Sequence, residues 1–219
     1  MSHAKNLHEL AVTFNKLLSD VQKKVTITIA LNDLENLKKA GYKLCFAKKV
    51  GNNDYNVVWH SYLTYLHNNT FSWTPQYALF GSNFFKNNIQ LIVSTNTVPI
   101  GPGETSILNQ YGVLKKPTTG GTHKGFTMDN RYGRIHPGVR QLSMGIDGET
   151  VSKPIYVSEN PIVKGKTVLE PVDRILVWFE QNIETGTMFN TSRSRQVEID
   201  LTDENTASRK YKNQKWVKS

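Results

Sequence analysis

The chain has 219 residues, a formal net charge of +9 at pH 7 and a hydrophobic fraction of 38%. This hydrophobic fraction excludes a disordered chain, and the longest apolar runs, such as 175–179, are too short to cross a bilayer. The length suits one β-rich domain with extensions at its ends.

The first residues carry no continuous apolar stretch followed by a small-residue cleavage site. We therefore expect synthesis in the cytoplasm without a signal peptide, and leave open release by lysis or non-classical secretion. The single cysteine, Cys45, excludes an intramolecular disulfide and agrees with a reducing compartment. Because it lies between Leu44 and Phe46 in a predicted strand, we interpret it as a buried structural thiol.

An amphipathic helix is predicted within residues 1–24, because apolar residues recur there at spacings of three and four. Its stripe could pack on a sheet and complete the core, or could enter the boundary of an anionic membrane. It could also form a seam between subunits, because five residues follow a heptad: Leu7, Leu10, Phe14, Leu17 and Val21.

From Val25 the apolar period changes to two, which predicts a first strand. A short helical turn is expected at 32–40, a strand at 42–50 and its returning partner at 55–60. Further strands are predicted at 76–85, 89–100, 105–114, 155–158, 174–183 and 194–201. This spacing is typical of an antiparallel β-sandwich, which we expect to span 25–205.

Residues 115–166 are rich in glycine and poor in apolar pairs. We predict long loops there, on one side of the sandwich, and such loops are often functional.

Aromatic residues alternate with small polar residues between positions 62 and 77. The rings could fill the core of a strand pair. They could also contact a glycan, a lipid headgroup or a protein, since each offers an apolar face. The candidates for this contact are Tyr62, Tyr65, Phe71, Trp73 and Tyr77.

The end of the chain, 206–219, has no acidic residue and is predicted to be a basic tail. Its cations include Arg209, Lys210, Lys212 and Lys215, interleaved with aromatic residues. Such a segment can grip single-stranded nucleic acid, but charge alone gives only non-specific attraction, so we favour this partner less.

No catalytic or metal-binding motif is visible. The six histidines show no pair at metal-ligand spacing, and no G-x-S-x-G elbow occurs. We therefore expect a non-enzymatic protein without a cofactor.

A helix of about twenty residues before a basic, aromatic-rich β body resembles the arrangement of actinoporin-type pore-forming cytolysins. The leading functional hypothesis is self-association into a homo-oligomer or larger structural assembly, through the helix and unpaired β edges. The alternative is a membrane-active, toxin-like or glycan-binding protein that docks through the 62–77 segment.

Overall fold

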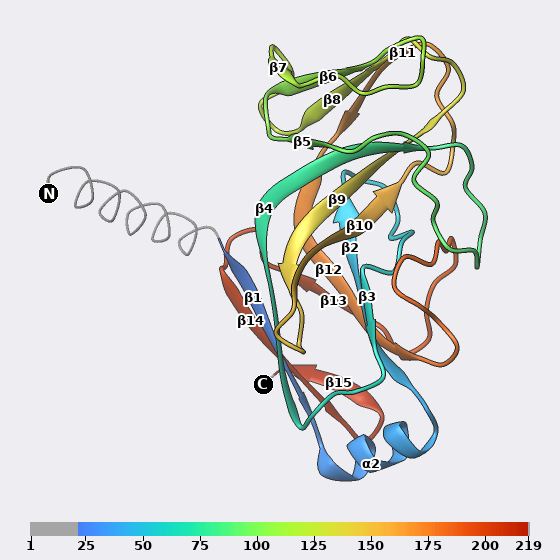
Figure 1. Ribbon diagram of the computed structural model, residues 1–219. Helices are drawn as coiled ribbons and strands as arrows, with labels where there is room; N and C mark the ends of the chain where they lie inside the picture. The colour runs from blue at the N-terminus through green and yellow to red at the C-terminus, as the bar shows by residue number, and fades with distance from the viewer. Residues whose placement is uncertain (1–21, 219) are drawn as a thin grey trace, which may run out of the picture.

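The computed structural model describes residues 22–218. The apolar stripe of the predicted helix, up to Val21, lies outside the described residues, and Lys23 and Lys24 already belong to the first strand. The described chain is mainly β, as predicted, and its strands form three sheets (Figure 1).

The largest sheet has the order β10-β9-β4-β1-β14-β15, with β5 beside β4. Its strands are β10 (Thr150–Val157), β9 (His136–Met144), β4 (Asn68–Ser82), β1 (Lys23–Ile29), β14 (Thr206–Lys212), β15 (Lys215–Lys218) and β5 (Val98–Ile100). The second sheet comprises β13 (Val197–Asp200), β12 (Pro171–Glu180), β2 (Lys43–Val50) and β3 (His60–Tyr62). The third comprises β11 (Gly165–Leu169), β8 (Phe126–Asn130), β6 (Glu104–Leu108) and β7 (Thr118–Thr119).

The early elements lie close to their predicted places: β1, the helix α2 (Leu31–Lys39) and β2. The partner of β2 is displaced from 55–60, because β3 makes the pairing, with His60 opposite Phe46. Most strand pairs are antiparallel, as expected, but β1 with β14 and β6 with β8 are parallel.

The core lies between the largest sheet and the second sheet. The alternating apolar residues of β1 point into it, and the Phe46 ring of β2 stacks on the Phe71 ring of β4 at a centroid distance of 4.4 Å. Burying a side chain of this size contributes about 1.5–3 kcal/mol. The opposite face of the second sheet is also covered, since Cys45 and Trp178 pack with Phe189. Cys45 is fully buried, as the sequence predicted, and so is Trp178.

The prediction of long loops at 115–166 is wrong, because the region contains β7, β8, β9 and β10 and the start of β11. At least one of its glycines serves close packing within a strand. A Cβ on Gly138 of β9 would lie 2.2 Å from Cζ of Phe80 in the neighbouring strand β4. The Phe80 ring can therefore occupy this place only because residue 138 has no side chain.

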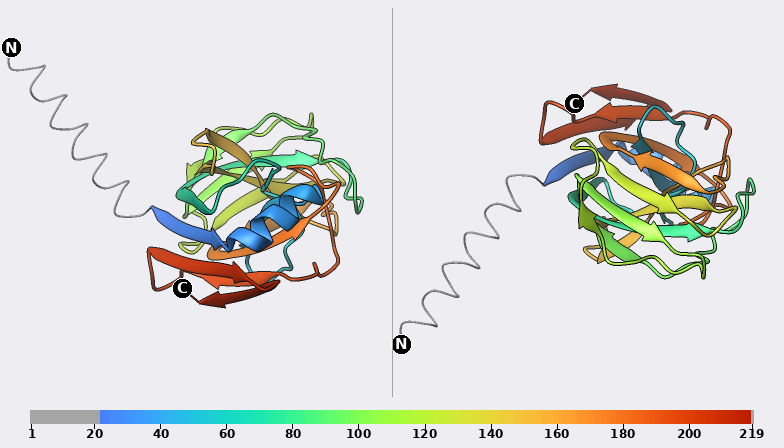
Figure 2. Two further views of the ribbon diagram at one scale, coloured as in Figure 1. Left: turned by 90° about the horizontal axis from the view of Figure 1, so that it is seen from below. Right: turned by 90° about the horizontal axis from the view of Figure 1, so that it is seen from above.

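The prediction of a C-terminal tail at 206–219 is also wrong for the described residues. β14 and β15 form a hairpin, and β14 pairs with β1 beside it (Figure 2). Tyr211 and Trp216 face each other across the hairpin and pack on Phe179, with centroid distances of 4.8 Å and 5.6 Å. The contacts of Tyr211 and Trp216 with Phe179 therefore attach this hairpin to the rest of the fold.

The helix α2 and the sheet of β6, β7, β8 and β11 lie at opposite ends of the molecule (Figure 1). Among the described residues, no helix has the length and hydrophobicity that crossing a membrane would need.

Candidate functional site

The aromatic residues predicted to contact a ligand at 62–77 do not form a surface site. Tyr65, Phe71 and Trp73 are at most 1% exposed and belong to the core, which was the alternative reading of this segment. Tyr62 and Tyr77 are half-buried, and the Tyr77 ring packs on Phe126. Phe71 and Trp73 of β4, and Tyr65 in the loop before it, are therefore not exposed for docking. A contact role for the half-buried Tyr62 and Tyr77 stays a prediction.

The other predicted binding residues are placed differently. The proposed oligomerisation residues from Leu7 to Val21 lie outside the described residues, so that role stays a prediction. Arg209 and Lys210 are half-buried in β14, whereas Lys212 and Lys215 are exposed at the hairpin turn. These cations belong to a paired β-hairpin.

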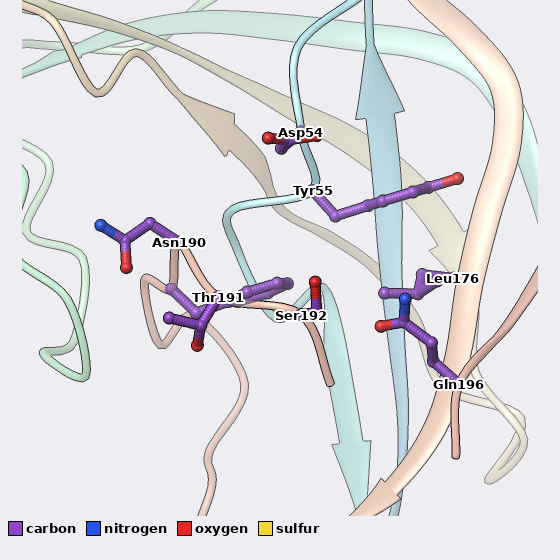
Figure 3. A pocket seen from close by; sticks show the side chains of 8 residues that line it. Asp54, Tyr55, Leu176, Asn190, Thr191, Ser192 and Gln196 are labelled. Carbon is purple, nitrogen blue, oxygen red and sulfur yellow. The ribbon is translucent and has the colours of Figure 1, made fainter. Parts of the chain in front are cut away.

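A polar pocket lies beside the second sheet, and the sequence pattern did not reveal it. Its walls come from three segments: Asp54 and Tyr55 after β2, Leu176 of β12, and the stretch from Phe189 to Gln196 before β13 (Figure 3). The cavity has a volume of about 130 Å³. Leu176 and Phe189 are almost fully buried and give it an apolar floor.

The rim of this pocket carries polar side chains that the protein itself leaves unused. Four exposed side chains of the rim form no hydrogen bond or ion pair with another described residue: Asp54, Asn190, Thr191 and Ser192. They supply a carboxylate, an amide and two hydroxyl groups. An apolar floor with convergent polar groups at the rim is the usual composition of a small-molecule site.

The stretch that supplies the rim is held in place by several contacts. The Arg193 guanidinium lies 4.4 Å from the Phe189 ring centroid, and its Nη1 donates a hydrogen bond to Oε1 of Glu180 at 2.9 Å. The backbone N–H of Arg193 donates to Oε1 of Gln196, and Nε1 of Trp216 donates to the carbonyl of Arg195. The pocket wall is thus attached to β12 and to the C-terminal hairpin.

Tyr55 closes the other wall. Its hydroxyl donates a hydrogen bond to Oε2 of Glu198 at 2.9 Å, and the Lys49 ammonium lies 5.6 Å from its ring centroid. Burial, reinforced by the Glu198 carboxylate, raises the pKa of Tyr55. Tyr55 therefore stays a neutral hydrogen-bonding group.

Asp54 also lines a second cavity of about 320 Å³, next to the first. The second cavity is lined by Asn52, Asn53, Asn56, Tyr156, Ser158, Glu159 and Asn160. Burial raises the pKa of Glu159, and the Asp54 carboxylate raises it further. Asn56 is structural here, since its amide donates to the carbonyl of Val157 at 2.6 Å.

The sequence carried a signal for this site in the polar runs Asn52-Asn53-Asp54 and Asn190-Thr191-Ser192, each next to an aromatic residue. Nothing in the sequence shows that the two runs meet. In the described residues, no cluster of three or more His, Cys, Asp or Glu side chains could hold a metal ion. Comparison with family models, curated proteins and solved structures finds no match.

Proposed function

We propose that the protein is a non-catalytic β-sandwich binding protein that takes a carbohydrate in the pocket around Asp54 and Ser192. The single observation that carries this proposal is the unused polar rim over the apolar floor of Phe189 and Leu176. A sugar ring presents hydroxyl groups around its edge and C–H groups on its faces. It therefore matches both parts of the pocket.

The chemistry of the rim favours a hydroxyl-rich ligand over a charged one. Asp54 accepts hydrogen bonds, whereas Asn190, Thr191 and Ser192 can both donate and accept. Among these four groups only Asp54 is charged, and a carboxylate repels phosphate or sulfate. Asp54 and the adjoining cavity with Asn160 extend the polar lining beyond one sugar unit.

The test is a glycan array probed with the full chain, followed by titration calorimetry with each glycan that binds. The variants Asp54→Ala and Thr191→Val should each lower the affinity by roughly tenfold, since each removes one hydrogen bond worth about 1–1.5 kcal/mol. Asp203→Ala is the matched control, because Asp203 is exposed and does not line the pocket.

Two results would contradict the proposal. Equal binding by the pocket variants and the wild type would place the ligand elsewhere, and an array without any bound glycan would remove the carbohydrate class. Release of free sugar from a bound glycan would overturn the non-catalytic part, and the neighbouring carboxylates of Asp54 and Glu159 would then be the first residues to replace.

A further inference from the structure

A second surface, formed by other residues than the carbohydrate pocket, consists of two loops with the same sequence pattern. The segments Asn109-Gln110-Tyr111-Gly112 and Asn130-Arg131-Tyr132-Gly133 repeat N-x-Y-G at a distance of 21 residues. They follow β6 and β8, which are parallel neighbours with Leu108 opposite Asn130. Both loops therefore leave the third sheet side by side, and together they are called the paired tyrosine loops.

The asparagine builds the same turn in each loop. Oδ1 of Asn109 accepts a hydrogen bond from the backbone N–H of Tyr111 at 3.0 Å, and Oδ1 of Asn130 accepts one from Tyr132 at 3.0 Å. Such turns stabilise the loop locally and explain why asparagine precedes each tyrosine by two positions. The asparagine side chain thus sets each turn, and both tyrosine rings are exposed, Tyr111 more than Tyr132.

The two loops also support each other. Gly112 has φ +75°, and a Cβ added there would lie 3.4 Å from Cε2 of Tyr132, so the Tyr132 ring covers this glycine. The backbone N–H of Arg131 donates to the carbonyl of Leu108 at 2.8 Å. Nδ2 of Asn130 donates to the carbonyl of Val163 at 2.6 Å, which adds the segment before β11 to the same surface.

This surface exposes apolar side chains. Tyr111 is 77% exposed, Val163 69%, Tyr132 44% and Val113 43%. Exposed apolar groups that lie together mark a site of interaction, because their contact with water is unfavourable and a partner would remove it. Tyrosine suits a boundary between water and an apolar phase, since its ring is apolar and its hydroxyl is polar.

Cations surround the apolar groups. Lys115, Arg131 and Lys164 line a groove of about 700 Å³ between the loops, and Asp129 is the carboxylate in that lining. Asp129 pairs with Arg131 at 3.0 Å, whereas neither Lys115 nor Lys164 forms an ion pair within residues 22–218. The groove therefore keeps unneutralised positive charge, which attracts an anionic partner.

We propose that the paired tyrosine loops dock this protein on the surface of a membrane that contains anionic phospholipids. Lysine and arginine near a surface attract anionic headgroups, and the tyrosine and valine side chains enter the boundary of the acyl chains. Valines favour this occupant over nucleic acid or an acidic glycan. Val113 and Val163 can neither stack on a base nor form a hydrogen bond with a hydroxyl group. Their transfer from water into an apolar environment is favourable, because it lowers the free energy.

The experiment is co-sedimentation of the full chain with vesicles of phosphatidylcholine alone or with added phosphatidylserine, at about 0.1 M and about 0.5 M salt. Binding should require phosphatidylserine and weaken at high salt. Tyr111→Ala and the pair Lys115→Gln with Lys164→Gln should each reduce binding at least tenfold. These side chains are exposed, so the fold is expected to survive, and the β signal in circular dichroism checks it.

Matched controls at the opposite end of the molecule should bind like the wild type: Leu66→Ala, at 65% exposure, for the tyrosine variant, and Lys39→Gln with Lys212→Gln for the charge variant. Equal binding by the loop variants would overturn the proposal and place any vesicle binding elsewhere in the chain. Equal binding to both kinds of vesicle would also overturn it. Loss of affinity for single-stranded nucleic acid in the loop variants, without any vesicle binding, would replace the membrane by that partner.

Discussion

The carboxylate of Asp33, in α2, accepts hydrogen bonds from the turn of the C-terminal hairpin: Oδ2 from the backbone N–H of Asn213 at 2.8 Å, and Oδ1 from that of Gln214 at 3.2 Å. Asn213 and Gln214 both have positive φ, at 51° and 60°, as a two-residue hairpin turn requires. A helix from the start of the domain thus holds the turn of its last two strands.

We expect Asp33→Ala to lower the free energy of unfolding by about 1–3 kcal/mol, because it leaves two backbone donors of the turn without their acceptor. Chemical denaturation followed by tryptophan fluorescence measures this change. Glu35→Ala, on the exposed side of the same helix, should change stability by less than about 0.5 kcal/mol. An effect of Asp33→Ala no larger than that of Glu35→Ala would show that the contact does not stabilise the hairpin.

A buried ion pair joins neighbouring strands of the second sheet, β2 and β12, and contacts Trp73 of the largest sheet. Nζ of Lys48 lies 2.9 Å from Oδ1 of Asp173 and 4.6 Å from the ring centroid of Trp73, and the Lys48 side chain is fully buried. Burial lowers the pKa of Lys48 to about 8, although the Asp173 carboxylate opposes this effect. Within residues 22–218, the Lys48 ammonium therefore depends on Asp173 as its counter-ion.

We expect Asp173→Ala to destabilise the protein by about 3–5 kcal/mol, because the charge on Lys48 would remain buried without its partner. The double variant Lys48→Met with Asp173→Leu should recover most of that loss, since two apolar side chains need no counter-ion. Urea denaturation of the two variants and the wild type makes the comparison. If the double variant were no more stable than Asp173→Ala, desolvation of Lys48 would not be the cause.

The burial of His60 predicts that the folded protein loses stability in acid. Its Nε2 lies 2.8 Å from Oγ of Ser143 and its Nδ1 2.9 Å from the hydroxyl of Tyr62. Burial, with a smaller contribution from Lys153, lowers the pKa of His60 from 6.5 to about 4. The unfolded chain therefore takes up the proton first as the pH falls.

The stability that neutral His60 contributes is complete above pH 6.5 and declines as the pH falls from 6.5 towards 4. The loss should approach about 3 kcal/mol, since one pKa unit corresponds to about 1.4 kcal/mol. Thermal unfolding across this range should show a steeper decline in the wild type than in His60→Gln, whose amide does not titrate. Parallel profiles for the two proteins would assign the acid sensitivity to other groups.

The assembly hypothesis for the first 24 residues can be tested independently of the β domain. Leu10→Asp combined with Leu17→Asp should yield smaller particles in light scattering, because charges on the apolar stripe prevent a helical seam. The β signal in circular dichroism should persist. A wild type that is monomeric at 24.8 kDa, or an unchanged particle size in the variant, would remove the helix from any assembly.

The local sequence pattern was sufficient for the elements that it specifies directly. Alternating β-branched residues predicted β1, and a short apolar pair before Gly41 predicted α2. A strand was predicted at 42–50, and β2 spans Lys43–Val50, with Leu44 to Ala47 buried. The sequence by itself also determined the mainly β class and the burial of Cys45.

Tertiary contacts decided the rest. The lysines around Tyr211 and Trp216 read as a solvated tail, yet the two rings hold a hairpin because Phe179 lies beneath them. The glycines of residues 115–166 led to a prediction of loops, although Gly138 lies in a strand and makes room for the Phe80 ring. The aromatic rings of β4 read as a surface site but face the core. Both proposed binding surfaces join segments distant in sequence, and neither side-chain period nor composition determines which segments meet.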